Sequence, residues 1–319
     1  MSATLLTQEK YRLVTRSDFD GLVCAVLLKE RNLIGEIRFV HPKDMQDGKI
    51  EISAHDITTN LPYVPGVHLA FDHHASEATR NIVENRIDNN RHIIIPEAPS
   101  AARVVYDYFG GAAAFPEISE EMMTAVDQAD SAQFSLEDIL QPTGWVLLNF
   151  IMDARTGLGR FKEFRISNYQ LMMNLIDCCK NLSIKEILNL PDVKERTDLY
   201  FDHQESFIEQ IKRCSTIYDN FIVIDLRFEN IIYAGNRFMV YALFPECNIS
   251  AHLMWGLNQQ NIVFAVGKSI LNRTSKINIG ELMLLYCGGG HANAGTCQIT
   301  NELAETVMLE LVTRINIEG

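Results

Sequence analysis

The chain has 319 residues, 47% of them hydrophobic, and a formal net charge of −13. This length predicts two domains, and the hydrophobic content is enough to build a core in each, which excludes a disordered protein. The negative charge excludes a general coat for duplex nucleic acid, because the mean field of the protein would repel the phosphate backbone.

In the first part of the chain, predicted strands alternate with predicted helices. Strands are predicted at residues 11–15, 35–42, 49–58 and 66–74, and helices at residues 22–33 and 100–110. We expect the third strand to end near Asp56 and the fourth at the triplet Asp72, His73 and His74. This alternation is typical of an α/β domain with a parallel sheet flanked by helices, whose ligand site lies at the carboxyl ends of the strands.

The later part of the chain changes from helices back to strands. Residues 118–182 are mostly helical in pattern, and the charged residues 183–215 are interpreted as a helical linker. Strands are then predicted at residues 220–228, 231–235, 248–256 and 261–271, and a helix at residues 277–286. We therefore predict a first domain at residues 1–182, a linker at 183–215 and a smaller α/β domain at 216–319, with an active-site cleft between the two domains.

Composition also bears on location and assembly. The seven cysteines show no CxxC spacing, and no apolar run approaches the roughly 18 residues of a membrane span. These features predict a cytoplasmic protein with reduced thiols and no membrane partner. The apolar helix at residues 169–182 fits either a homodimer interface or the protein core, and we expect the core.

Acidic residues stand where the first and third predicted strands end. Asp18 and Asp20 flank a turn that Gly21 permits, so both carboxylates can face one point, where a divalent cation would offset their repulsion. Asp56 follows the same pattern. A helix cap at Asp18 and a side-chain turn at Asp56 are the structural alternatives.

The triplet Asp72, His73 and His74 adds nitrogen ligands to these carboxylates. Carboxylate and imidazole ligands together favour Mn²⁺, Co²⁺ or Zn²⁺, whereas Mg²⁺ and Ca²⁺ prefer oxygen alone. Asp127 and Asp130, three residues apart on a predicted helix, share a face and can each complete the set. The choice between these two aspartates stays open from the sequence.

Three consecutive glycines at residues 288–290 precede His291 near the end of the chain. Glycine can adopt positive φ and present backbone N–H groups to an anion, and a neighbouring imidazole can pair with that anion. A flexible glycine-rich loop is the alternative. We expect the segment to bind a phosphate or carboxylate group.

Taken in order, these segments resemble the DHH phosphoesterase superfamily. "SDFDGLVCAVLL", the strand-end Asp56, "FDHH" and "DSAQF" follow the order of its motifs, and "GGGHANAG" resembles the motif of the companion DHHA1 domain. The resemblance covers nearly the whole chain, from Asp18 to Gly295. It implies a hydrolase similar to oligoribonucleases, exopolyphosphatases or cyclic-dinucleotide phosphodiesterases, which uses one or two Mn²⁺ ions, or Mg²⁺ or Co²⁺, to activate water.

The resemblance also implies roles for individual residues. The metal ligands would be Asp18, Asp20, Asp56, His73 and Asp130, the last because it stands four residues before Phe134. Asp72 would orient His73, and His74 would contact the substrate phosphate or assist proton transfer. In the second domain, the terminal phosphate or nucleotide portion of the substrate would be bound by Arg273, Gly288, Gly289, Gly290 and His291.

Arg16 is the serious departure from the family pattern. Relatives with this short motif carry histidine at that position, and a permanently protonated guanidinium cannot ligate a metal. Either the first metal keeps fewer protein ligands, or Arg16 replaces its charge and grips a phosphate beside a single metal. In both cases Arg16 is expected to be a catalytic residue that neutralises charge developing on oxygen.

Two functions follow from these residues. The favoured one is a metal-dependent phosphohydrolase that cleaves a small substrate: a short single-stranded oligonucleotide, a nucleoside bisphosphate, a cyclic dinucleotide or polyphosphate. The alternative is a catalytically weakened or inactive phosphate-binding sensor on the same fold, for which Arg16 is the evidence. The acidic net charge fits a small ligand better than long nucleic acid.

Overall fold

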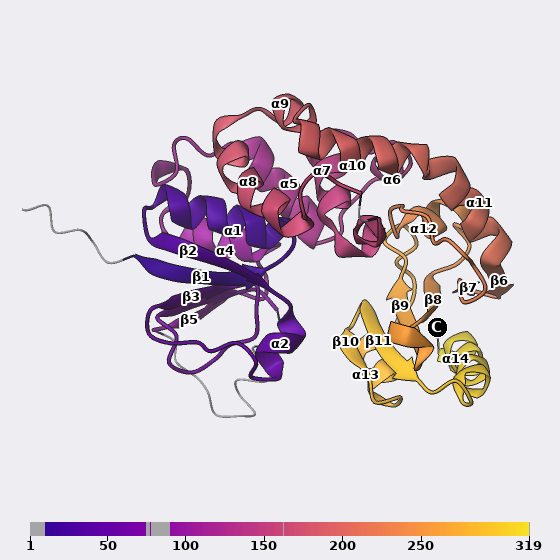
Figure 1. The fold of residues 1–319 in the computed structure, drawn as a ribbon. Coiled ribbons are helices and arrows are strands. Elements are labelled where there is room, and N and C mark those ends of the chain that lie inside the picture. Colours follow the sequence, from indigo (N-terminus) through magenta and orange to yellow (C-terminus); the bar gives the residue numbers. More distant parts are fainter. Residues whose placement is uncertain (1–9, 75–76, 78–89, 162, 319) are drawn as a thin grey trace, which may run out of the picture. The chain divides into compact units, whose positions relative to one another are not determined.

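The computed structural model describes residues 10–74, 77, 90–161 and 163–318, which fold into two compact units (Figure 1). The first unit contains Met1–Gln133, Thr143–Ala154 and Lys162–Arg196, and the second contains Phe134–Pro142, Arg155–Phe161 and Thr197–Gly319. The chain therefore crosses between the units several times. The expected boundaries after residues 182 and 215, and the cleft between domains, stay predictions.

The first unit is built on a five-stranded sheet with the strand order β2-β1-β3-β4-β5. Its strands are β1 (Tyr11–Arg16), β2 (Ile34–Val40), β3 (Asp56–Thr59), β4 (Leu69–Asp72) and β5 (His92–Ile94). Every neighbouring pair of strands is parallel. All five carboxyl ends therefore lie at one edge of the sheet, and the predicted α/β fold is confirmed.

Both faces of this sheet are buried, since the adjacent residues Leu13 and Val14 of β1 point to opposite faces and are both fully buried. The helices of this unit are α1 (Phe19–Glu30), α2 (Pro42–Gln46), α4 (Ala101–Tyr108), α5 (Glu120–Asp130), α7 (Gly144–Met152), α8 (Asn168–Asn181) and α9 (Ile184–Leu188), with a short 3₁₀ helix η1 (Gly111–Ala113). Helix α1 contacts β1, β2, α4, α5 and α8. Its apolar residues are buried from Phe19 to Leu28, as expected for a helix that is hydrophobic on every side.

Helix α8 lies in the core of the first unit, as we expected of the apolar residues 169–182. Its buried residues are Leu171, Met172, Leu175, Ile176 and Cys179, and it contacts α1 and α9. Helix α10 (Pro191–Asp202) continues from the first unit into the second. Within the described ranges, no helix is both long enough and apolar enough to cross a bilayer.

The second unit is built on a six-stranded sheet with the order β10-β11-β9-β8-β7-β6. Its strands are β6 (Ser215–Tyr218), β7 (Phe221–Asp225), β8 (Ile249–Trp255), β9 (Ile262–Lys268), β10 (Gly289–His291) and β11 (Ala294–Ile299). Strands β7 and β8 are parallel, and the other pairs are antiparallel. The helices are α6 (Leu136–Leu140), α11 (Gln204–Cys214), α12 (Met239–Leu243), α13 (Ile279–Leu284) and α14 (Ala304–Glu318), with 3₁₀ helices η2 (Ala154–Thr156), η3 (Leu158–Arg160) and η4 (Leu257–Gln259).

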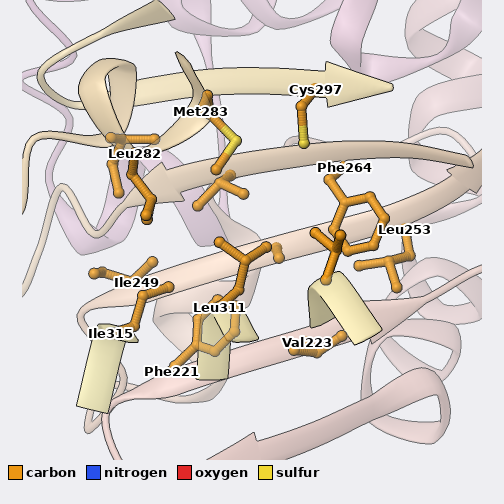
Figure 2. Packing of buried hydrophobic residues seen from close by; sticks show 14 of the residues in the cluster. Phe221, Val223, Ile249, Leu253, Phe264, Leu282, Met283, Cys297, Leu311 and Ile315 are labelled. Carbon is orange, nitrogen blue, oxygen red and sulfur yellow. The ribbon is translucent and has the colours of Figure 1, made fainter. Parts of the chain in front are cut away.

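One face of the second sheet packs on α13 and α14 and forms the core of this unit (Figure 2). Alternate residues of β7, β8 and β9 point into it, as the period of two in a strand requires. Leu282 and Met283 come from α13, and Leu311 and Ile315 come from α14. On the other face, the Tyr241 hydroxyl of α12 lies 2.8 Å from the Ser250 hydroxyl of β8.

Two of the predicted strands are wrong in detail. The third strand begins at Asp56 instead of ending near it. Residues 231–235 form no strand, because their backbone N–H groups bond elsewhere: that of Tyr233 to the Gln210 side chain at 3.1 Å and that of Ala234 to the His203 ring at 3.1 Å. Strand β10, at the glycine triplet, was not predicted as a strand.

Leu311→Ala is expected to lower the free energy of unfolding by about 2–5 kcal/mol, because it leaves a cavity at the fully buried centre of the second core. Leu309→Ala is the matched control. It lies on the same helix with a side chain 57% exposed, so its cost should stay within about 0.5 kcal/mol. Urea unfolding followed by tryptophan fluorescence measures both, and equal losses in the two variants would contradict this description of the core.

Candidate active site

Polar side chains gather at the carboxyl edge of the parallel sheet. Strand β1 ends at Arg16, strand β4 ends at Asp72, and Asn60 follows β3 directly. Helix α1 begins right after β1, so Asp18 becomes its N-cap and accepts a hydrogen bond from the backbone N–H of Gly21 at 2.9 Å. This is the edge at which open α/β sheets bind ligands.

Gly21 lets the chain make this turn. A Cβ atom at this position would lie 2.0 Å from the backbone oxygen of Arg16, which no side chain can tolerate. The glycine therefore brings the first turn of α1 against the end of β1, as the sequence predicts, and sets Asp18 and Asp20 on the same turn.

Asp20, His73 and Asp130 form a cluster of potential metal ligands, which we call the trio. One ligand atom from each lies within 4.8 Å of the others. His73 Nε2 is 2.8 Å from Asp130 Oδ2, and His73 Nδ1 is 3.1 Å from the carbonyl oxygen of Ala98. The Ala98 contact fixes the ring with Nε2 turned towards the carboxylates, which is how a supporting carbonyl orients a metal-binding histidine.

Asp20 is buried and is held by the N-terminus of helix α4. Its carboxylate accepts hydrogen bonds from the backbone N–H groups of Ala101 at 3.0 Å and Ala102 at 2.8 Å. Burial raises the pKa of Asp20, and the negative charge of Asp130 raises it further, whereas His73 opposes both. The positive charge of the neighbouring side chains is therefore not enough to stabilise the ionised form of the Asp20 carboxylate.

Asp130 and Asp127, between which the sequence could not choose, have different partners. Asp130, at the end of α5, contacts His73 in the trio. Asp127 accepts a hydrogen bond from the Ser100 hydroxyl at 2.7 Å and forms an ion pair with Arg103, Nη2 to Oδ2, at 2.6 Å. Since Ser100 caps α4, Asp127 supports the helix terminus that holds Asp20.

Asp72 contacts His74, not His73 as we expected. Its Oδ1 atom is 2.7 Å from His74 Nδ1. The reason is local geometry, because side chains two residues apart in extended chain share a side whereas adjacent ones do not. Burial lowers the pKa of His74, but the hydrogen bond and charge of Asp72 outweigh it and raise the pKa above its usual value.

A second group of side chains stands beside the trio. Arg16 Nε is 2.9 Å from Asp18 Oδ2, and Asn60 Nδ2 is 3.2 Å from Asp18 Oδ1. Asn60 is 1% exposed, and its Oδ1 atom is buried without a hydrogen-bond partner. Asn60 was not predicted from the sequence. It directly follows β3, so the rule that site residues follow strand ends would have identified it if this strand had been placed at residues 56–59.

Asp56 is not brought to this edge. It opens β3 opposite Arg12 of β1, at the amino edge of the parallel sheet. Arg12 donates to it through Nε at 2.6 Å and Nη2 at 3.0 Å, and the backbone N–H of Ser53 donates at 2.6 Å. The expectation that Asp56 is a metal ligand rested on the misplaced strand, and the structure gives this carboxylate a structural ion pair instead.

The expected substrate-binding residues lie at one end of the second sheet. Arg273 is in the loop between β9 and α13, where its Nε donates to the carbonyl oxygen of Ile270 at 2.9 Å. Both ends of this loop bond to the turn that follows His291: Lys268 N donates to Asn293 O at 2.8 Å, and Ile279 N donates to Ala292 O at 3.1 Å. The loop of Arg273 and the turn after His291 are therefore neighbours.

The glycine triplet has a packing role that the sequence did not suggest. Gly289, Gly290 and His291 form the edge strand β10, paired with β11. At Gly290, with φ of 159°, a Cβ atom would lie 2.3 Å from the carbonyl oxygen of Ala294. Glycine is needed here for close pairing of two backbones, and phosphate binding by this segment stays a prediction.

Comparison with known proteins gives a full-length relative. No protein-family model and no curated protein matches the chain. Among solved structures, it is similar to the pGpG-specific phosphodiesterase PggH from Vibrio cholerae, with 61% identity over 97% of this chain and 100% of that one and a TM-score of 0.83.

Two more distant structures share the fold. RecJ from Thermus thermophilus, in complex with Mn²⁺, has 12% identity and a TM-score of 0.52, with 98% of this chain and 53% of RecJ covered. CDC45 from Entamoeba histolytica has 8% identity and a TM-score of 0.50, with 96% of this chain and 95% of that one covered. At such identities the likeness supports the fold alone.

Asp56→Asn is expected to leave the affinity for Mn²⁺ unchanged and to lower the free energy of unfolding by about 2 kcal/mol, through loss of the charged bond to Arg12. Burial alone would raise the pKa of Asp56, but the hydrogen bonds from Arg12 and Ser53 outweigh it and hold the pKa below its ordinary value.

The stability difference between wild type and Asp56→Asn should therefore be full above about pH 5 and shrink as the pH falls through this lowered pKa. Titration calorimetry with Mn²⁺ and urea unfolding across pH measure the two effects. A loss of Mn²⁺ binding in Asp56→Asn would restore this residue as a ligand.

Proposed function

The chain belongs to the DHH/DHHA1 phosphoesterase family, and on this basis we propose that it is a metal-dependent phosphodiesterase whose substrate is pGpG. The observation that carries the substrate is the 61% identity, over 97% of this chain, to a pGpG-specific phosphodiesterase. A linear dinucleotide is also a small phosphodiester of the kind that the sequence predicts. Hydrolysis of its internal phosphodiester bond yields two mononucleotides.

The alternative of an inactive phosphate sensor on the same fold is not favoured, because a protein with 61% identity is a phosphodiesterase. Among the substrates that the sequence suggests, we favour a short oligonucleotide, here a dinucleotide, over polyphosphate and cyclic dinucleotides. The cytoplasmic location and the homodimer stay predictions.

The trio has the chemistry of a divalent cation site. Two carboxylates and one imidazole are the ligand types that favour Mn²⁺ or Co²⁺. Burial lowers the pKa of His73, but the bond to Asp130 and the surrounding carboxylates raise it to about 9, so that a proton supplies positive charge between Asp20 and Asp130. We infer that Asp20, His73 and Asp130 hold the cation and that Mn²⁺ is the first candidate.

The side chains around the trio would act on the phosphate. When bound, a divalent cation polarises the phosphoryl group and lowers the pKa of the attacking water. Asp72 fixes the His74 ring and favours its protonated form, so His74 can donate to the leaving oxygen. Arg16 adds a permanent positive charge for a phosphate oxygen. Asp72 is thus a positioning residue for His74.

The second unit would bind the terminal phosphate or nucleotide portion of the substrate. Arg273 and His291 lie on neighbouring segments at one end of the sheet, and a guanidinium binds a terminal phosphate through two parallel hydrogen bonds. The contribution of the glycines to substrate binding would be indirect, because the small size of Gly288, Gly289 and Gly290 lets β10 pack closely against its neighbours.

Asp130→Asn and His73→Ala are each expected to lower kcat by roughly 100-fold or more and to weaken Mn²⁺ binding, because each removes a ligand while the N-cap contacts of Asp20 remain. Phosphate-ester hydrolysis and titration calorimetry with Mn²⁺ measure these effects. Asp56→Asn, the aspartate at the opposite edge, is the control and should keep both properties. Wild-type Mn²⁺ affinity in Asp130→Asn would exclude the trio as the cation site.

A substrate panel tests the proposed substrate. With Mn²⁺, pGpG is expected to be cleaved to GMP at least about 100-fold more efficiently than polyphosphate or a ten-nucleotide RNA, measured as kcat/KM by chromatography. Arg273→Gln should raise KM for pGpG with little change in kcat, since it removes binding remote from the reacting bond. Comparable rates on polyphosphate would contradict the proposal.

A further inference from the structure

Arg16, Asp18 and Asn60 form a compact polar group at the carboxyl edge of the first sheet, next to the trio. Asp18 is the centre of the group. Its carboxylate meets Arg16 Nε at 2.9 Å, Asn60 Nδ2 at 3.2 Å and the backbone N–H of Gly21 at 2.9 Å. An acidic residue that could have bound a cation is thus engaged by three donors of the protein itself.

Neither neighbour of Asp18 carries the negative charge that would balance a second cation. A guanidinium stays protonated at every physiological pH and has no lone pair to offer a metal. The Asn60 amide is neutral, and it must turn its Nδ2 towards Asp18 because the oxygen would be repelled. Its Oδ1 is left buried and without a hydrogen-bond partner, although the residue is only 1% exposed.

The charge of the site also fits a single cation. Arg16 and Asp18 neutralise each other, and the carboxylate of Asp72 is engaged by His74, Nδ1 to Oδ1 at 2.7 Å. Asp20 and Asp130 then remain as the two carboxylates of the trio, and one divalent cation balances them. A second divalent cation would add two positive charges beside the guanidinium with no carboxylate left to compensate them.

Arg16 is placed to act on the same substrate as that cation. Its side chain is 33% exposed, and its contact with Asp18 is made through Nε at 2.9 Å. Arg16 ends β1, and Asp20 of the trio lies on the first turn of the helix that Asp18 caps. The guanidinium and the trio therefore share the carboxyl edge of the sheet.

We propose that this enzyme works with one divalent cation, held by the trio, and that Arg16, fixed by Asp18 and Asn60, takes the place of a second cation and binds a phosphate oxygen of the substrate. The inference rests on the proposed function for the identity of that substrate. It concerns the number of ions and the role of this chain's own residues, so it can be tested without measuring turnover.

The first experiment counts ions. Wild-type protein equilibrated with Mn²⁺ by dialysis should hold one ion per chain by elemental analysis and show the spectrum of isolated Mn²⁺ by electron paramagnetic resonance. The double variant Arg16→His with Asn60→Asp restores two ligands at the carboxyl edge, so it should hold two ions per chain and show a spin-coupled pair. Arg12→His, which alters the Arg12–Asp56 pair at the opposite edge, is the matched control and should stay at one.

The second experiment measures phosphate binding by Arg16. Arg16→Gln should weaken equilibrium binding of GMP by about tenfold or more, because it removes a charge-assisted hydrogen bond, and should leave the Mn²⁺ count at one. Arg16→Lys, which keeps the charge but not the fork, should recover part of this affinity.

The outcomes separate this inference from the proposed function. Two tightly bound ions in the wild type, or one ion in a folded double variant, would overturn the single-cation centre even if pGpG is cleaved. Unchanged GMP affinity in Arg16→Gln would overturn the role of Arg16. If the wild type holds one ion but does not cleave pGpG, the substrate proposal fails and the ion count stands. Circular dichroism establishes whether each variant is folded. If the double variant does not fold, the number of Mn²⁺ ions per wild-type chain decides on the single-cation centre.

Discussion

The hydrogen bonds between the Asp20 carboxylate and the N-terminus of α4 are the interaction on which the site depends. Two backbone N–H groups and the helix dipole hold a buried negative charge that would otherwise be too costly. Asp20 belongs to α1, which follows β1, whereas α4 begins some eighty residues later. This one carboxylate therefore ties the first turn of α1 to a distant helix, and Asp127, bound to Ser100 and Arg103, fixes that helix from its other side.

Much of the fold could be predicted because its signals are local. Apolar strands that end in polar residues, alternating with helices, indicated a parallel sheet with a site at its carboxyl edge, and the structure has this sheet. The same rule pointed to Asp20 and His73, which follow strands, and the resemblance to the DHH superfamily pointed to Asp130, with Asp127 left open. These three residues lie together in the structure, although they are far apart in the sequence.

The sequence misled where one strand boundary or one side-chain direction decided the outcome. Ending the third strand near Asp56 instead of at Thr59 put Asp56 at the carboxyl edge and hid Asn60, because a short shift moves a residue from one end of a four-residue strand to the other. Asp72 was expected to orient the neighbouring His73, but in the extended chain its side chain contacts His74 instead. The glycines suggested a loop, because the close contact of two backbones in β10 and β11 depends on pairing that no local pattern reveals.

Arg16 gives the site a property that a second metal ion could not. A bound metal ion is present only when its concentration exceeds its dissociation constant, whereas a guanidinium is always present and always charged. With Asp18 and Asn60 holding it, the positive charge for the substrate phosphate is part of the folded chain. In the proposed centre, Arg16 would contribute to substrate affinity and the cation at the trio would activate water. Binding and chemistry would be separable in such a centre, because the charge of the guanidinium does not depend on the concentration of the metal.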